Sequence, residues 1–191
     1  MKYVAFTLVF VIIFLSIIEI STLGVRIYRG RRIAAESTPY EAKRPGASKS
    51  LLIVGDSTGV GTGAVRPQES IAGRIAAEFK NVNIINVSRN GAMVRDVYAQ
   101  LQGTGSRSFD VIIVHAGAND ILYFSPLKGL RESVEALLES ARKKGGYVIF
   151  LSNGNLGLSP AFFTPLNWVY TCRARKVRQL FIEVEAERGV Q

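Results

Sequence analysis

The stretch from Leu51 to Gly59, which reads LLIVGDSTG, decides the fold of this chain. Its first four residues are apolar, and the run stops at Gly55, which is typical of a short buried strand followed by a tight turn. Further runs of this kind predict strands at residues 82–87, 110–115 and 147–151. Apolar residues with helical spacing predict helices at residues 67–79, 94–101, 127–144 and 166–188.

The alternation of apolar strands and helices predicts one α/β domain over residues 51–191, with a parallel sheet covered by helices on both faces. In such a sheet, the groups that bind ligands or carry chemistry gather at the carboxyl ends of the strands. The segments that matter most for function are therefore those that follow Val54, Val87 and His115.

The composition restricts the classes of function. The chain has 191 residues, and 24 lysines and arginines against 15 acidic residues give it a net charge of +9. More than half of this excess lies in residues 26–49, and no helix-turn-helix, zinc or RNP motif accompanies it, so the sequence argues against nucleic-acid binding. A single cysteine, Cys172, excludes an internal disulfide and a cysteine-based zinc site.

The amino-terminal segment predicts a membrane anchor. Residues 3–18 are apolar except for two hydroxyl side chains, and a helix that continues to residue 25 is long enough to cross a bilayer. An uncleaved transmembrane anchor over residues 1–25 is favoured over a cleaved signal peptide, because only Lys2 precedes the apolar run and no small-x-small cleavage site follows it. Residues 26–50 are expected to form a basic tether.

The sequence does not decide on which side of the membrane the α/β domain lies. The arginines of residues 26–32 place the domain in the cytoplasm under the positive-inside rule. The same arginines are also suited to hold anionic lipid headgroups on either side. The sequence therefore predicts a single-pass membrane protein without choosing its orientation.

Polar loops follow the first three predicted strands. Ser57 lies directly after the first strand and between glycines, so its hydroxyl is expected at the edge of the sheet. Asn90-Gly91 follows the second strand and favours a positive φ that aims a backbone N–H outward. Asn119 follows the third strand and offers a side-chain amide, and Asp120 suits the start of a short helix. A hydroxyl, a backbone N–H and a carboxamide at neighbouring strand ends are the parts of a nucleophile with an oxyanion hole.

These loops resemble, in the same order, the sequence blocks of the SGNH (GDSL-type) hydrolases. Gly55-Asp56-Ser57 is similar to the block that bears the nucleophile, Asn90-Gly91 to the block whose glycine N–H serves the oxyanion hole, and Gly117-Ala118-Asn119-Asp120 to the G-x-N-D block whose asparagine is the second donor. The resemblance covers about residues 51–191 and implies a flavodoxin-like three-layer α/β/α fold. It implies hydrolysis of an ester or thioester of a small molecule, lipid or carbohydrate, with Ser57 as nucleophile, Gly91 and Asn119 as oxyanion donors, and neither a metal nor an organic cofactor.

The last block of that family, D-x-x-H, has no counterpart in this sequence. It supplies the histidine base and its aspartate, so we expect the sequence to be truncated before it. His115 lies inside an apolar strand and is expected to pack or hydrogen-bond beneath the site rather than to act as the base. Without a base the serine is a poor nucleophile, and residues 1–191 alone are then expected to be weakly active.

Two other functions remain open from the sequence. The first is a catalytically silent, membrane-anchored domain of the same fold that holds an acyl or sugar ligand. The second is a nucleotide-binding flavodoxin-like module, against which the loop chemistry argues because the phosphate-binding glycine spacings are missing. Residues 160–165, which read PAFFTP, follow the fourth strand and form either an apolar wall beside the site or part of the core.

Overall fold

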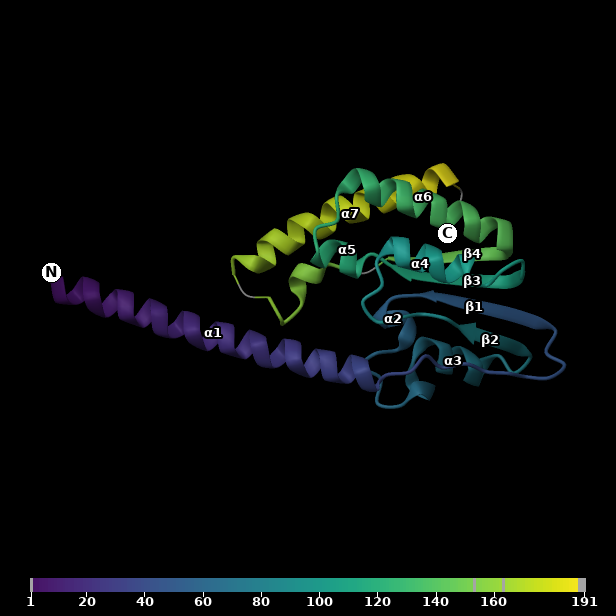
Figure 1. Ribbon diagram of the computed structural model, residues 1–191, viewed down its shortest axis with the longest axis horizontal. Helices are drawn as coiled ribbons and strands as arrows, with labels where there is room; N and C mark the ends of the chain where they lie inside the picture. The colour runs from purple at the N-terminus through teal and green to yellow at the C-terminus, as the bar shows by residue number, and fades with distance from the viewer. Residues whose placement is uncertain (1, 153, 163, 189–191) are drawn as a thin grey trace. The chain divides into compact units, whose positions relative to one another are not determined.

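The computed structural model describes residues 2–152, 154–162 and 164–188, and the chain divides into two compact units, residues 1–36 and 37–191 (Figure 1). The first unit is one helix, α1 (Lys2–Glu36), of 35 residues. Residues 26–36, expected in the tether, are the last turns of this helix. No proline interrupts it before Pro39, and an isolated glycine such as Gly30 is tolerated inside a helix.

The transmembrane segment expected at residues 1–25 is not found in the structure. Among the residues that the structure describes, no helix is both long enough and apolar enough to cross a bilayer.

The second unit is built on a sheet of four parallel strands in the order β2-β1-β3-β4. The strands are β1 (Lys49–Gly55), β2 (Val82–Asn86), β3 (Phe109–Ala116) and β4 (Gly145–Ser152). β1 therefore lies between β2 and β3, and the carboxyl ends of all four strands lie at the same edge of the sheet. The predicted α/β class and parallel sheet are confirmed.

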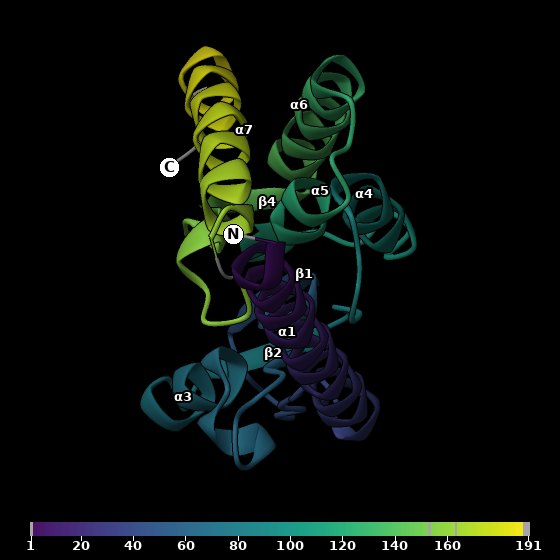
Figure 2. The same ribbon diagram turned by 90° about the vertical axis from the view of Figure 1, so that its left-hand side faces the viewer.

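Helices lie on both faces of the sheet. One face carries α4 (Val94–Gln102), α5 (Ala118–Leu122), α6 (Leu127–Lys144) and α7 (Leu166–Arg188), and the other carries α2 (Ser57–Val60) and α3 (Ile71–Glu78). Two short 3-10 helices, η1 (Pro67–Glu69) and η2 (Leu156–Leu158), lie in the connections. Figure 2 shows α6 and α7 side by side on one side of the sheet and α3 on the opposite side.

The apolar strands explain why both faces must be covered. Along β1, Leu52 and Val54 lie in the core formed with α4, α6 and α7. The alternating residues, Leu51 and Ile53, lie in a second and smaller core with α3. Because successive side chains of a strand point to opposite faces, a strand that is apolar at every position needs a helix on each side.

The predicted helix over residues 67–79 is divided in two. It forms η1 and then α3, and Ser70 separates them as the amino-terminal cap of α3. The Ser70 hydroxyl accepts a hydrogen bond from the Gly73 N–H at 3.2 Å. A serine that accepts a hydrogen bond from a free N–H of the first helical turn strongly favours the start of a helix. Here a new helix begins directly after Ser70.

The segment before β1 packs against the sheet edge. Ala42 is buried and forms an antiparallel bridge with Ile84 of β2. The Arg44 guanidinium donates hydrogen bonds to the carbonyl oxygens of Ala76 and Phe79, both at 2.5 Å. These are free carbonyls at the end of α3, where a cation is favourable. This part of the predicted tether is therefore attached to the domain.

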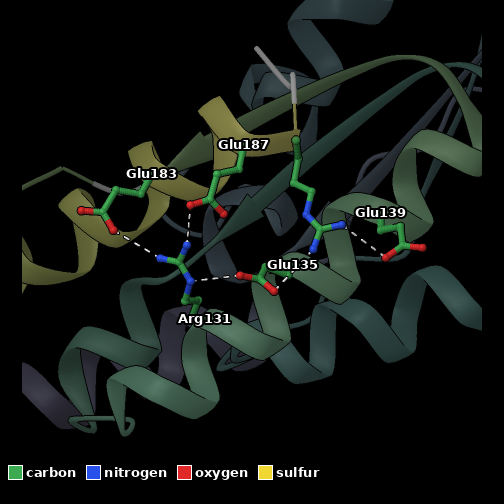
Figure 3. Close-up of polar contacts among 6 residues, drawn as sticks. Arg131, Glu135, Glu139, Glu183 and Glu187 are labelled. Carbon is green, nitrogen blue, oxygen red and sulfur yellow. Dashed lines mark hydrogen bonds and ion pairs between the residues drawn. The ribbon is translucent and has the colours of Figure 1, made fainter.

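A network of ion pairs joins α6 to α7 (Figure 3). Arg131 of α6 lies 3.0 Å from Glu135 on its own helix, and 3.2 Å and 2.6 Å from Glu183 and Glu187 of α7. Arg188 of α7 completes the network by pairing with Glu135 and with Glu139. The two longest helices of the domain are thus held together by charge as well as by their apolar faces.

Candidate active site at the carboxyl edge of the sheet

Ser57 is the first residue of α2 and follows β1 after one intervening residue. That residue, Asp56, is fully buried, and its carboxylate accepts a hydrogen bond from the Thr58 N–H at 2.9 Å. Asp56 therefore fixes the turn that leads into Ser57. α2 is a single turn that ends at Gly61, whose φ of 86° reverses the chain. Ser57 itself is half-buried.

Gly91 lies in the loop that follows β2. Its φ is 77°, as the Asn-Gly pair predicts, and the residue is exposed. The N–H of Ala92 bonds to the Arg89 carbonyl at 3.3 Å, which closes the turn around Gly91. The loop is also tied to the neighbouring strand, because the Arg89 N–H donates to the Gly55 carbonyl at 2.9 Å.

Asn119 lies in α5, directly after β3. Its Nδ2 donates a hydrogen bond to the Ala92 carbonyl at 3.0 Å, so the side chain reaches from the third strand end to the glycine loop. A carboxamide has two N–H donors. One of them makes this contact.

Two further contacts hold the serine turn against the glycine loop. Asn86, buried at the end of β2, donates to the Gly59 carbonyl at 2.9 Å and accepts from the Ser88 N–H at 3.1 Å. The Thr62 hydroxyl donates to Asn90 Oδ1 at 2.6 Å. The segments that carry Ser57, Gly91 and Asn119 are therefore brought together at one edge of the sheet. Asn86 was not predicted from the sequence, although a polar residue inside an apolar strand is a signal for it.

Asp120 does not have the predicted role of a cap for its own helix. It is the third residue of α5, whose start at Gly117 has no side-chain cap. The buried carboxylate accepts from the Val94 N–H at 2.9 Å and from the Ser125 hydroxyl at 2.8 Å. It satisfies a free N–H of α4, a helix 26 residues away in sequence, and this partner is visible only in the folded chain.

His115 lies inside β3, opposite Gly55 of β1, and is buried. Neither of its ring nitrogens has a hydrogen-bond partner among the described residues. Burial lowers the pKa of the imidazole, and the nearby Asp56 carboxylate only partly opposes this shift. His115 therefore makes no hydrogen bond to Ser57, in agreement with its expected place beneath the site.

Aromatic side chains border the segments that follow β3 and β4. The Phe162 ring stacks on Tyr170 at a centroid distance of 4.2 Å, and Phe124 lies 5.4 Å from Tyr170. Of the apolar pair in residues 160–165, Phe162 therefore packs against α7, and Phe163 lies outside the described residues.

An open hollow lies between the glycine loop and α4. A pocket of about 270 Å³ is lined by Arg89, Asn90, Gly91, Asp96 and neighbouring residues of α4. In the described parts of the chain, no group of three or more histidines, cysteines and carboxylates is placed to hold a metal ion.

Fold and site together define an α/β protein with a serine, a backbone N–H and a carboxamide at the carboxyl edge of a parallel sheet. Residues 53–191 match the model of the GDSL-like lipase/acylhydrolase family. The chain belongs to this family. No curated protein matched the sequence.

Several solved structures share the fold. AlinE4, described as an SGNH-hydrolase family esterase, is 17% identical, with 78% of this chain and 76% of that chain covered and a TM-score of 0.60. A lipolytic protein of the G-D-S-L family from Veillonella parvula is 19% identical, with coverages of 74% and 75% and a TM-score of 0.55. The psychrotrophic esterase EstA from a Pseudoalteromonas species is 16% identical, with coverages of 75% and 75% and a TM-score of 0.55.

Proposed function

We propose that this protein is an ester hydrolase in which Ser57 is the nucleophile and the Gly91 N–H and the Asn119 side chain stabilise the oxyanion. The observation that carries the proposal is the hydrogen bond from Asn119 to the Ala92 carbonyl, which links the third strand end to the glycine loop beside the serine turn. Membership of the GDSL-like lipase/acylhydrolase family supports an acyl ester as the substrate class.

In this mechanism the Ser57 Oγ attacks the acyl carbon of the ester and loses its proton to a base. The carbonyl oxygen becomes an oxyanion, to which Gly91 N–H and Asn119 Nδ2 donate hydrogen bonds. Collapse of this intermediate breaks the ester bond, and the alcohol leaves with a proton returned by the base. Water then attacks the acyl-serine in the same way and releases the acid.

The proposed mechanism also needs a general base that takes the proton from Ser57. The only histidine in the sequence is His115, and its burial in β3 without a polar contact gives it no path to the serine hydroxyl. We therefore assign no base among residues 1–191. The experiments below use the protein as isolated from its source organism, so that every residue of the mature protein is present.

The test is turnover of a simple acetyl ester, together with labelling by a fluorophosphonate. Ser57→Ala should abolish labelling and lower kcat by several orders of magnitude, because the remaining groups bind but cannot attack. Ser140→Ala is the matched control, since Ser140 is a half-buried helical serine on α6, away from the strand ends. Turnover that persists in Ser57→Ala would contradict the proposal.

Asn119→Ala tests the oxyanion assignment separately. Loss of one donor should lower kcat by about 100- to 1000-fold with little change in KM, because the bond strengthens only in the transition state. An unchanged kcat would remove Asn119 from the mechanism.

A ligand-binding domain without catalysis is the second candidate. The observation in its favour is that neither ring nitrogen of His115 has a hydrogen-bond partner among the described residues, so this histidine is not bonded to Ser57. Under this alternative, the wild-type protein neither hydrolyses acetyl esters nor reacts with the fluorophosphonate. Saturable binding of an acylated sugar or lipid to the wild-type protein, measured by calorimetry, would then support it.

We also propose that the amino-terminal segment attaches the enzyme to a membrane. Residues 3–18 are almost wholly apolar in sequence, and Phe6, Phe10 and Ile17 are exposed on α1. Sedimentation of the protein with membranes, and its loss on deletion of residues 2–36, would support attachment. A full-length protein that stays in the supernatant would contradict it.

A further inference from the structure

Gln100 of α4 is a buried polar residue that the proposed mechanism does not use. Only 8% of it is exposed, although most of α4's polar residues face solvent. Its Oε1 accepts a hydrogen bond from the Gly55 N–H at 2.8 Å. Its Nε2 donates a hydrogen bond to the Gly55 carbonyl at 3.0 Å. One side chain thus binds both backbone groups of a single residue, the last residue of β1.

The end of β1 needs this support because β2 ends earlier. β2 stops at Asn86, and the N–H groups of Val87 and Arg89 after it donate to the β1 carbonyls of Ile53 and Gly55. The Gly55 N–H finds its acceptor in Gln100 instead of in a neighbouring strand. A buried backbone N–H needs such a partner, so Gln100 extends the hydrogen bonding of the sheet by one position.

Gly55 lies two residues before Ser57. On its other side β1 is bound to β3, where the Asp56 N–H donates to the His115 carbonyl at 3.1 Å. The backbone that leads into the serine turn is therefore held from β3 and from α4. A glutamine suits the α4 side because its amide carries one acceptor and two donors.

We propose that Gln100 is a positioning residue for Ser57, acting through the two hydrogen bonds to Gly55. This inference rests on the proposed function insofar as it concerns catalysis. It assigns to α4 a task in the active site: together with the Arg89 N–H of the glycine loop, Gln100 keeps the backbone before the nucleophile in register with the oxyanion donors.

Gln100→Leu removes both hydrogen bonds and keeps most of the side-chain volume. The expected result is a kcat lowered by about 10- to 100-fold, because a small displacement of a nucleophile has this effect, while KM changes little. Gln102→Leu is the matched control. Gln102 is exposed on the same helix, and its side chain donates a hydrogen bond to the Ser140 hydroxyl on α6.

Gln100→Glu separates positioning from mere packing. A protonated glutamic acid can accept from the Gly55 N–H and donate to its carbonyl, whereas the carboxylate cannot donate. The ratio of kcat in Gln100→Glu to kcat in the wild type should therefore rise as the pH falls. Asp56, His115 and Arg89 adjoin Gly55, and Asp96 lines the same pocket as Gln100. These groups are common to both proteins, so the ratio compares the two side chains at position 100.

Hydrogen exchange of the Gly55 amide gives a readout that needs no catalysis. In Gln100→Leu this amide should exchange faster than in the wild type, while the amide of Ile113 in the middle of β3 keeps its protection. Both amides should keep their wild-type rates in Gln102→Leu.

These measurements distinguish failure of the two proposals. If the wild type hydrolyses no ester but Gly55 exchange accelerates in Gln100→Leu, the positioning of the strand end stands and the proposed function fails. If the wild type is active and Gln100→Leu retains full kcat, the inference is overturned. Unchanged Gly55 exchange in Gln100→Leu, or a flat Gln100→Glu ratio across pH, also overturns it.

Discussion

Gly55 shows how closely a single position is constrained at the residue scale. A Cβ built on this glycine would lie 2.7 Å from both Cβ and the carbonyl oxygen of His115. Neither atom can move without displacing β3. The glycine before the serine turn is thus required by the close approach of two strands.

We predict that Gly55→Ala destabilises the domain by about 2 kcal/mol, the usual cost of overpacking a rigid core. Chemical denaturation measures this change in the free energy of unfolding. Gly129→Ala on α6 is the control, because a Cβ there meets nothing within 4 Å, and removing a helical glycine should stabilise by about 1 kcal/mol. Equal stability of Gly55→Ala and the wild type would show that the strands can separate.

His115 offers a second test at this scale, because its imidazole signal in NMR can be identified by its loss in His115→Leu. Burial lowers its pKa from the ordinary value of 6.5, so the unfolded chain binds the proton more readily than the folded chain. Stability should therefore fall as the pH drops below about 6.5, and this part of the pH dependence should vanish in His115→Leu. An imidazole that titrates above 6.5 would contradict the burial argument.

At the scale of elements, local signals set the limits of the long helices. The helices over residues 127–144 and 166–188 begin and end as their apolar periodicity predicts. The segment 67–79 does not form one helix, because the Ser70 cap starts a new helix after η1. Periodicity alone could not place this break, since the helical spacing of Ile71, Ile75 and Phe79 does not show where the helix begins.

The Arg131 network is a property of two elements together. Arg131 contacts carboxylates on α6 and α7, and these hydrogen bonds and charges raise its pKa above the ordinary value. We predict that Arg131→Gln lowers the Tm and that the difference shrinks at high salt, which screens partly exposed charges.

Lys143→Gln is the control for this prediction, because Lys143 pairs with Glu139 of its own helix, four residues away. Thermal melts of both variants at low and high salt provide the comparison. A Tm for Arg131→Gln equal to that of Lys143→Gln at low salt would mean that the network adds no stability between the helices.

At the scale of the whole molecule, the sheet and both hydrophobic cores lie within residues 37–191. We therefore predict that a chain without residues 2–36 unfolds cooperatively, with the Tm of the full-length protein. Circular dichroism during heating measures this. A lower Tm or a broad transition would show that α1 contributes to the stability of the domain.

The sequence determined by itself the class of fold and the choice of candidate residues. Strand and helix periods, the glycine turns and the order of the loops predicted a parallel α/β sheet, which is confirmed. They also named Ser57, Gly91 and Asn119, whose roles stay predictions. This was possible because each of these signals depends on neighbours along the chain.

Only the tertiary structure decided which side chains hold the loops together. Gln100 binds Gly55 from 45 residues away, Asp120 binds Val94 of another helix, and Asn86 holds the serine turn. Each is a polar group buried by the fold, and its partner is chosen by which backbone N–H or carbonyl the packing leaves unpaired. No local pattern contains that information, because the unpaired group arises only when distant elements come together.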